Sequence, residues 1–301
     1  MKNRMEIEKK RVAGVSVIAA FFLTGFKLVI GLLTGSLGLL SEALHSGLDL
    51  VAAVITWFSV RISDTPPDKN HHYGHGKIEN FSALIETFLL LITCAWIIYE
   101  AVHRLMSGNT MIEVNVFSYF VVLTSIAIDI ARSRALYRVA RKYNSQALEA
   151  DALHFSTDIW SSAVVLLGLI LAQFGWFFAD SVAALAVAFI VLGVSWKLGK
   201  RATDVLLDRT PAPLVAKLEL LLSQAQGILR YHDLRVRTSG AEIFIEVTIH
   251  VQPGLTLEEA HEISQQLEKH IIHALPRSYV HVHIEPDEHM PEIVGENNVI
   301  E

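Results

Sequence analysis

Cysteine is almost absent from this chain, because its 301 residues include only Cys94, which lies within an apolar run. A single cysteine can form neither an intrachain disulfide nor a thiolate metal cluster. Any metal chemistry must therefore use histidine, aspartate and glutamate, and the sequence contains 14 histidines.

Basic residues are fewer than acidic ones, with 25 lysines and arginines against 31 aspartates and glutamates. The net charge is −6 with histidine neutral, which argues against a nucleic-acid-binding protein. The sequence shows no P-loop and no phosphorylated-aspartate motif, so ATP is not the evident energy source. We expect no cleaved signal peptide, because the apolar run that begins at Val12 is too long and several others follow it.

Long apolar runs dominate the first 200 or so residues, whereas the remainder has the composition of a soluble domain. A helix that crosses a bilayer needs about 20 mostly apolar residues. Six stretches meet this condition: Val12–Leu33, Leu37–Ile62, Phe81–Leu105, Val114–Ala135, Ala152–Phe174 and Phe177–Trp196. The predicted fold class is a membrane α-helical domain of six transmembrane helices, followed by a C-terminal cytoplasmic α+β domain.

Basic residues gather in alternate connections of this predicted domain. They occur in the N-terminal segment, between the second and third helices, between the fourth and fifth, and after the sixth, whereas the other three connections contain only Arg104. Since cytoplasmic segments are enriched in lysine and arginine, both termini and the soluble domain are predicted to be cytoplasmic. We expect an integral protein of a bacterial-type inner (plasma) membrane.

The soluble part reads as helix, strand, strand, helix, strand. Helical periodicity covers Leu214–Gln226, and strands are predicted at Leu234–Arg237 and Ile243–Val251, joined by a hairpin at Ser239-Gly240. Thr256 and Glu259 form a capping-box pattern ahead of the second helix, and alternating apolar residues from 280 to 284 predict a third strand. Three strands leave an exposed edge and a small core, so dimerisation would help this domain. The predicted domain boundaries are 1–11 (N-terminal segment), 12–208 (membrane), 209–291 (cytoplasmic α+β) and 292–301 (disordered tail).

Two ionisable pairs lie deep in the apolar helices. His45 and Asp49 belong to the second helix, His154 and Asp158 belong to the fifth, and each pair shares one helix face because its members are four residues apart. Each histidine is about nine residues into its helix, so at 1.5 Å per residue it lies about 14 Å deep, near the middle of a ~30 Å core. The two helices run in opposite directions. Side by side, they would place His45 opposite Asp158 and Asp49 opposite His154.

Such a group of two imidazoles and two carboxylates suits a tetrahedral divalent ion. Without metal, protons should neutralise the carboxylates, so metal and protons would compete for one site. Zn²⁺ fits this ligand set best, while Co²⁺, Ni²⁺ and Fe²⁺ stay open. The alternative is that each pair is only a hydrogen-bonding device between helices, but four buried ionisable groups at matched depth are costly for that purpose.

Several motifs together resemble the cation diffusion facilitator family of zinc and iron exporters, over essentially residues 10–290. The motifs are Gly35-Ser36, Ser41-x3-His45-x3-Asp49, Asp68-x2-His71-x-Tyr73-Gly74-His75-Gly76-Lys77-x-Glu79, Ala150-Asp151-x2-His154-x3-Asp158, Leu207-Asp208-Arg209 and His232-Asp233-Leu234-Arg235. The resemblance implies a homodimer that exports metal by alternating access, with protons as the counter-substrate and a metallochaperone-like cytoplasmic domain. It maps the transport site onto His45, Asp49, His154 and Asp158. Some bacterial members have aspartate where this chain has His45, and the histidine form is similar to that of zinc-selective members, which disfavour cadmium.

The resemblance also implies two accessory metal sites, in which Zn²⁺ would be a structural or regulatory ion. The first is a loop site at Asp68, His71 and His75, for which the alternative is a solvated polar loop. The second lies in the cytoplasmic domain, at His232, His250, His261, His283 and Glu285. Here the sequence departs from the family pattern: a position that is often histidine is Thr248, for which His250 could substitute, and the usual aspartate is Glu285. Surface histidines without metal are the alternative.

Three other functions compete with secondary transport. A membrane metalloenzyme would need an open coordination position and a nearby general base, and the pattern shows four ligands and no spare glutamate beside them. A metal-sensing scaffold without transport activity is disfavoured by the intact four-ligand set. Uptake instead of export is not excluded by the residues alone, since direction follows from the resemblance and from the cytoplasmic accessory sites.

Overall fold

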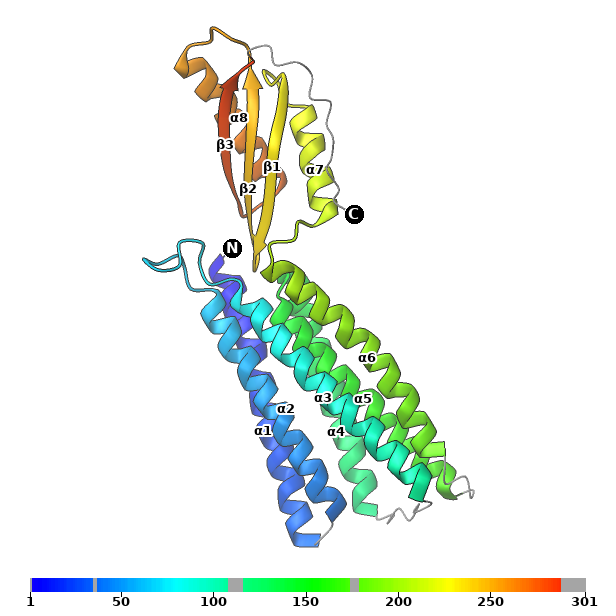
Figure 1. Ribbon diagram of the computed structural model, residues 1–301. Coiled ribbons are helices and arrows are strands. Elements are labelled where there is room, and N and C mark those ends of the chain that lie inside the picture. The colour runs from blue at the N-terminus through cyan, green and yellow to red at the C-terminus, as the bar shows by residue number, and fades with distance from the viewer. Residues whose placement is uncertain (1, 35–36, 108–115, 174–178, 288–301) are drawn as a thin grey trace. The chain divides into compact units, whose positions relative to one another are not determined.

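The computed structural model describes residues 2–34, 37–107, 116–173 and 179–287 (Figure 1). The chain divides after Leu207 into two compact units. The motif Gly35-Ser36 and the predicted tail 292–301 lie outside the described residues.

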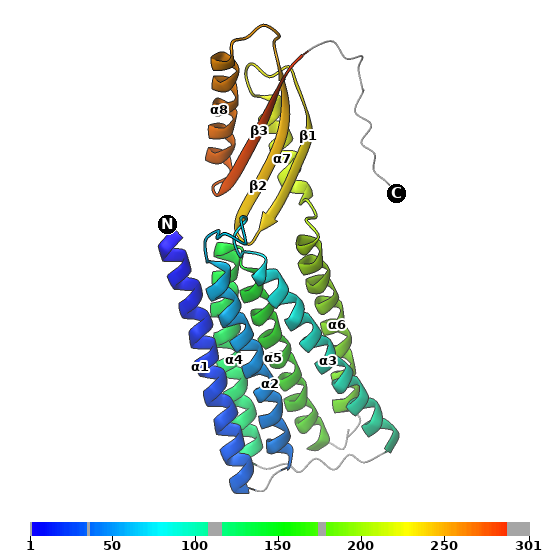
Figure 2. The same ribbon diagram turned by 60° about the vertical axis from the view of Figure 1, so that its left-hand side comes forward.

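The described residues of the first unit form six long helices, which Figures 1 and 2 show side by side. They are α1 (Lys2–Thr34), α2 (Leu37–Ser63), α3 (Ile78–Ser107), α4 (Val116–Tyr143), α5 (Gln146–Gln173) and α6 (Ala179–Leu206). Helix α1 packs along α2, α3 along α6, and α4 along α5, while α2 also contacts α5. Small residues such as Ala13, Ala53 and Ala152 are fully buried between helices, which allows their backbones to approach closely.

Large apolar side chains face outward from this unit. Phe22 is 70 % exposed, Trp96 67 % and Phe189 64 %, which is unfavourable in water and favourable in lipid. Within the described residues, four helices are long and apolar enough to cross a membrane by composition alone: Arg4–Leu33, Ala43–Ser63, Ile78–His103 and Ser181–Leu206. Helices α4 and α5 do not meet this measure, and both carry buried polar residues such as Asp129, Arg132, Asp151 and Asp158.

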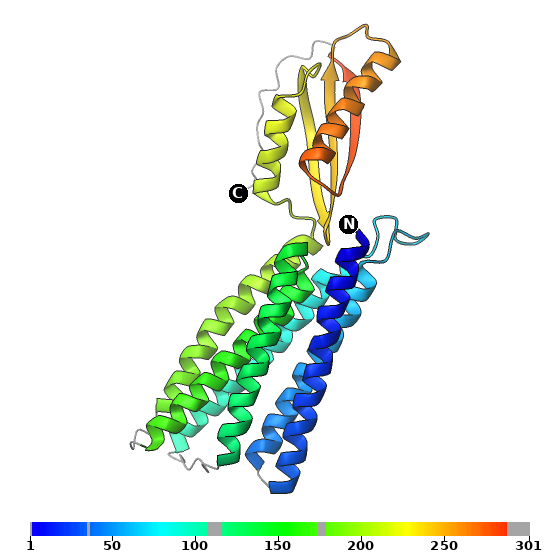
Figure 3. The same ribbon diagram turned by 180° about the vertical axis from the view of Figure 1, so that it is seen from behind.

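The second unit is a two-layer α+β domain with the predicted order of elements. It consists of α7 (Ala212–Ser223), β1 (Arg230–Ser239), β2 (Glu242–Val251), α8 (Leu257–Ala274) and β3 (Ser278–Pro286). The sheet order is β1-β2-β3, with β2 antiparallel to β1 and parallel to β3. Both helices cover one face of the sheet (Figure 3), where Leu218 and Ile271 pack against Ile245 and Ile249.

The local predictions for this unit are largely confirmed. The hairpin joins β1 to β2 at residues 240–241, and Thr256 and Glu259 form the complete capping box at the start of α8. The observed boundaries of α7, β1 and β2 differ from the predicted ones by one to four residues. Helix α7 ends at Ser223, and β1 begins at Arg230, because the strand continues through a bulge between His232 and Arg235. Asp233 in that bulge has a φ of 51°, a conformation that aspartate tolerates better than most residues.

Candidate metal centres

His45, Asp49, His154 and Asp158, here called the helix cluster, come together between α2 and α5. His154 Nε2 lies 2.9 Å from Asp49 Oδ1 and 3.8 Å from Asp158 Oδ2. His45 Nε2 lies 3.6 Å from Asp158 Oδ1. The cross-helix pairs are therefore those that depth and opposite helix direction predict, His45 with Asp158 and Asp49 with His154.

The spacing of these atoms suits one small cation. A tetrahedral ion with bonds of about 2.0–2.2 Å places its ligand atoms about 3.3–3.6 Å apart. The observed separations of 2.9, 3.6 and 3.8 Å bracket this range. Ligand atoms of His45, Asp49 and Asp158 lie within 4.8 Å of one another, and His154 adjoins this group through its contacts with both aspartates.

Burial makes the cluster electrostatically demanding. His154 is 2 % exposed, Asp49 8 % and Asp158 9 %, whereas the His45 side chain is 37 % exposed. Among the described residues, His154 Nδ1 and Asp158 Oδ2 are buried without a hydrogen-bond partner. Two carboxylates in a medium of low polarity need a cation or protons to offset their charge, and His45 provides the most accessible side of the cluster.

Further buried polar groups surround the helix cluster, and only Asp151 belongs to a motif singled out in the sequence. The Arg132 guanidinium donates to the Ser16 hydroxyl at 3.1 Å, and that hydroxyl donates to Asp151 Oδ2 at 3.3 Å. Lys27 Nζ donates to Ser46 Oγ at 2.8 Å, and the Thr56 hydroxyl donates to the fully buried Glu86. An ionisable residue inside an apolar run is the signal that could have identified Glu86, Lys27 and Arg132.

A second buried network ties four helices together near the predicted cytoplasmic ends. Lys9 on α1 lies 2.7 Å from Asp64 and 2.8 Å from Glu79 on α3. Glu79 also accepts hydrogen bonds from Ser63 at 3.0 Å and from Ser145 at 2.5 Å. This network fixes the start of α3 and the start of α5 next to the loop that carries Asp68.

Asp68, His71 and His75, here called the loop cluster, lie between α2 and α3. Asp68 Oδ1 is 3.2 Å from His71 Nδ1, and Asp68 Oδ2 is 3.4 Å from His75 Nε2. Backbone N–H groups of Asn70 and His71 donate to the Asp68 carboxylate and lower its pKa. The three side chains offer ligand atoms within 4.8 Å of one another, which is close enough for one ion to draw them together.

The third group, here called the sheet cluster, consists of His232, His250, His283 and Glu285 on the sheet face opposite the helices. His250 Nε2 lies 3.0 Å from His232 Nδ1 and 3.7 Å from Glu285 Oε2, and His283 Nε2 lies 3.5 Å from Glu285 Oε1. Cross-strand register explains the grouping, since Thr248 pairs with both His232 and His283, and His250 pairs with Glu285.

His261 does not join the sheet cluster within one protomer. It belongs to α8, which covers the other face of the sheet, and its ring contacts Gln265 at 3.0 Å. The predicted set of five ligands therefore separates into four on the open face of the sheet and one on the helix layer.

Comparison with known proteins agrees with this architecture. The profile of the cation efflux transmembrane domain matches residues 13–207, and that of the cation efflux protein cytoplasmic domain matches residues 211–287. An uncharacterised transporter of Synechocystis is 32 % identical over 91 % of this chain and 89 % of its own length. The cation-efflux pump FieF of Shewanella oneidensis is 30 % identical over 92 % of this chain and 94 % of its own length.

A third relative is named for manganese. The manganese efflux system protein MneS of Bacillus subtilis is 27 % identical over 94 % of this chain and 98 % of its own length. The matched profiles and relatives span both units, and the first unit presents long apolar helices. The chain is therefore an integral membrane cation-efflux transporter that belongs to the cation diffusion facilitator family.

Proposed function

We propose that this transporter exports Zn²⁺ in exchange for protons, and that the helix cluster is its transport site. One observation carries the proposal: two histidine–aspartate pairs from antiparallel helices meet in a group of four side chains, three of them buried. This ligand set suits Zn²⁺ and is poor for Cu(I), which prefers sulfur, and for Mg²⁺ or Ca²⁺, which prefer oxygen alone.

Competition between metal and protons supplies the exchange. When Zn²⁺ leaves, the two carboxylates and two imidazoles remain in surroundings of low polarity, so protons bind in its place. When protons leave toward the cytoplasm, the site regains its charge and binds Zn²⁺ again. Alternating access of the cluster to the two sides of the membrane then couples inward proton flow to outward metal flow.

The orientation of the chain follows from its charges. We propose that all six long helices cross the inner membrane, including α4 and α5, whose polar residues are buried inside the helix bundle. The basic connections then place both termini and the second unit in the cytoplasm. The protein acts as a homodimer, which would cover part of the small three-stranded domain.

The loop cluster and the sheet cluster are accessory sites in this proposal. Both would lie on the cytoplasmic side, and each offers three or more histidine and carboxylate ligands. Zn²⁺ bound there would act as a structural or regulatory ion. The exposed position of His71, His232 and His283 suits an ion that exchanges with the cytoplasm.

A flux assay in proteoliposomes tests the proposal. Zn²⁺, Cd²⁺, Fe²⁺, Co²⁺ and Mn²⁺ are compared with and without a pH gradient, and the relative MneS makes Mn²⁺ a necessary competitor. We expect Zn²⁺ to move fastest, with acceleration by an opposing proton gradient. Asp49→Ala and Asp158→Ala should reduce flux to the level of empty liposomes, whereas the exposed control Glu262→Ala should not change it.

Each result has a distinct meaning. Zinc flux at the parent rate in both aspartate variants would reject the site. Flux of Mn²⁺ or Fe²⁺ in preference to Zn²⁺ would reject the metal while keeping the site. Zinc flux that ignores the pH gradient would reject proton exchange, and zinc binding without any flux would indicate a metal-sensing scaffold.

A further inference from the structure

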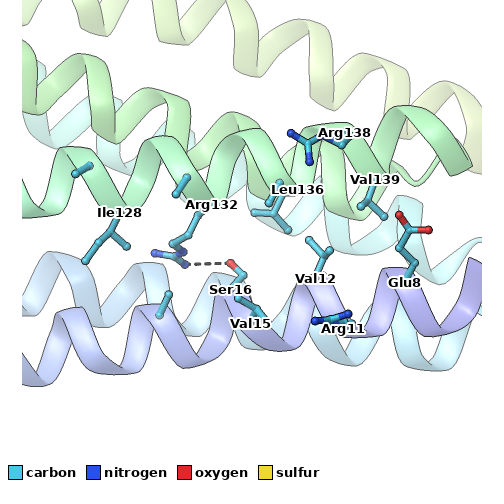
Figure 4. Close-up of a pocket in the computed structure, with 14 residues that line it drawn as sticks. Glu8, Arg11, Val12, Val15, Ser16, Ile128, Arg132, Leu136, Arg138 and Val139 are labelled. Atoms are coloured by element: carbon cyan, nitrogen blue, oxygen red, sulfur yellow. Dashed lines mark hydrogen bonds between the residues drawn. The ribbon is translucent and has the colours of Figure 1, made fainter.

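A groove of about 590 Å³ runs along the outer side of the first unit between α1 and α4 (Figure 4). Its walls are mainly small or branched apolar side chains: Val12, Val15, Ala19, Ala127, Ile128, Ala131, Ala135, Leu136 and Val139. The volume lies within the range of about 300–1,000 Å³ that is usual for small-molecule sites. The lining is too apolar for a path that carries ions.

The length of the groove matches one leaflet of a bilayer. Its lining extends from residue 127 to residue 139 on α4 and from residue 8 to residue 19 on α1, which corresponds to about 16–18 Å at 1.5 Å per residue. Half of the hydrocarbon core of a bilayer is about 15 Å thick. A single acyl chain that enters at the basic end would therefore reach the far end of the groove.

The end of the groove nearest the predicted cytoplasmic surface is basic. Arg11 on α1 and Arg138 on α4 line the groove there, immediately beyond the apolar stretches of their helices. Figure 4 shows the two side chains on opposite sides of the groove, and both are exposed, so each can turn toward a headgroup at its mouth. Glu8 lies at the same end, but its carboxylate already accepts a hydrogen bond from Lys142 at 2.6 Å and another from Tyr143 at 2.5 Å. In the described part of the chain, neither arginine forms an ion pair.

Deeper in the groove, Arg132 reaches from α4 toward Ser16 on α1 (Figure 4). Arg132 is only 6 % exposed, and its Nε has no hydrogen-bond partner among the described residues. Through Ser16 the guanidinium connects to Asp151 on α5, three residues from His154. A molecule bound in the groove would therefore lie beside the hydrogen-bonded series Arg132, Ser16 and Asp151. This series ends on α5, one of the two helices that form the helix cluster.

We propose that this groove binds one anionic phospholipid of the cytoplasmic leaflet, with its phosphate at Arg11 and Arg138 and one acyl chain along α1 and α4. Basic pockets between transmembrane helices on the cytoplasmic side are suited to anionic headgroups. The unpaired arginines, the apolar lining and the length of one leaflet together specify this occupant. The choice of leaflet rests on the proposed orientation, but lipid binding does not depend on which metal is carried.

Native mass spectrometry of the full chain in detergent tests this site, with phosphatidylglycerol and phosphatidylcholine of identical acyl chains as probes. We expect the wild type to bind phosphatidylglycerol at least fivefold more tightly. Each arginine near the surface contributes roughly fivefold to anionic-lipid affinity, so Arg11→Gln combined with Arg138→Gln should weaken phosphatidylglycerol binding by at least tenfold. Phosphatidylcholine carries the same phosphate, but its choline offsets the charge, so its binding should weaken clearly less than that of phosphatidylglycerol in that variant.

Two controls separate this site from general surface charge. Arg61→Gln removes an exposed arginine of α2 that does not line the groove, and it should change both affinities less than twofold. Ala131→Trp fills the groove without a change of charge, and it should weaken both lipids. Arg138→Lys keeps the positive charge and should keep the preference for phosphatidylglycerol over phosphatidylcholine. This result would show that the loss of affinity in the glutamine variant reflects charge and not unfolding.

Three outcomes would overturn the proposal. The first is equal binding of the two lipids by the wild type. The second is an unchanged lipid preference in the double glutamine variant. The third is a loss of phosphatidylglycerol affinity in Arg61→Gln as large as the loss in the double variant. Unchanged binding in Ala131→Trp would place the lipid elsewhere and would also overturn it. None of these outcomes involves zinc, so a failure here is distinct from a failure of the transport site.

Discussion

The helix cluster and the sheet cluster use the same two kinds of ligand in opposite surroundings. Three of the four members of the helix cluster, His154, Asp49 and Asp158, are at most 9 % exposed, with His45 at 37 %. In the sheet cluster the side chains of Glu285 and His283 are 41 % and 64 % exposed, with His250 at 13 %. Water can solvate the sheet cluster whether or not an ion is bound. In the helix cluster only His45 is well exposed, so we expect a metal ion or protons to offset the charge of its two buried carboxylates. The comparison indicates that burial, and not ligand identity, makes one group suited to exchange and the other suited to reversible binding.

The largest effect should follow from the same change made in both clusters. Asp49→Asn and Glu285→Gln each convert a carboxylate to an amide of equal size. We expect Asp49→Asn to abolish zinc flux in proteoliposomes, because one ligand and one compensating charge are lost from a buried site. Glu285→Gln should keep flux within about threefold of the wild type, a change well below the ~10–100-fold that disrupted metal sites usually show. Equal losses in both variants would contradict the comparison.

A second, smaller effect should appear in metal choice. His45→Asp replaces a nitrogen ligand by oxygen at the most accessible member of the helix cluster, and the resemblance implies that histidine here disfavours cadmium. We expect the ratio of zinc flux to cadmium flux to fall by about tenfold, within the ~10–100-fold range for altered metal sites. The matched change His283→Asp in the sheet cluster should leave this ratio unchanged. An unchanged ratio in His45→Asp would mean that the pocket, and not this ligand, sets metal choice.

The sheet cluster should affect metal content more than flux. His232 and His250 lie 3.0 Å apart, so the combined variant His232→Ala and His250→Ala removes the central pair. Equilibrium dialysis of the full chain should show about one Zn²⁺ fewer per protomer. The two histidines of the helix cluster are unchanged in this variant, so zinc binding at that cluster should persist. The exposed His270→Ala and His273→Ala serve as the matched control. An unchanged zinc content would mean that the sheet cluster binds no zinc and that its histidines are ordinary surface residues.

The smallest effect concerns pH and the second unit. The backbone N–H of Thr256 donates to Glu259 and lowers the pKa of that carboxyl below its usual 4.5. A carboxyl with a lowered folded-state pKa adds stability that is complete above its unfolded pKa and is lost as pH falls through the folded value. Glu259→Ala should therefore lower the melting temperature at pH 7, and the difference should shrink below about pH 4. Calorimetry from pH 3 to 8 measures this, and Glu258→Ala, which leaves the capping box intact, should show a smaller effect.

Local patterns predicted most of the fold because they depend on near neighbours in the chain. The capping box at Thr256 and the hairpin before Glu242 are set by a few adjacent residues. The four-residue spacing of His45 and Asp49 fixes their common helix face in the same way. Matched depth on antiparallel helices was enough to predict the cross-helix pairing of the helix cluster, since a membrane leaves helices few other arrangements.

Other features required contacts between distant residues. The position of His261 away from the sheet cluster depends on which sheet face α8 covers, and its spacing in sequence carries no such information. Glu86 and Thr56 meet across α2 and α3, and Lys9 meets Asp64 and Glu79 across three segments. Each of these charges looked unfavourable or unremarkable alone, because its partner is 30 or more residues away.

The sequence by itself determined the ligand types, their spacing, the apolar runs and the alternation of basic connections, since each is a property of one segment. Tertiary structure alone decided which of those side chains lie together, which histidine lies apart from the sheet cluster, and where α1 and α4 leave a groove with arginines at one end. The physical reason is that packing chooses among helix faces of nearly equal hydrophobicity. Only the packed arrangement shows which polar groups remain in contact with each other and which remain open to lipid or water.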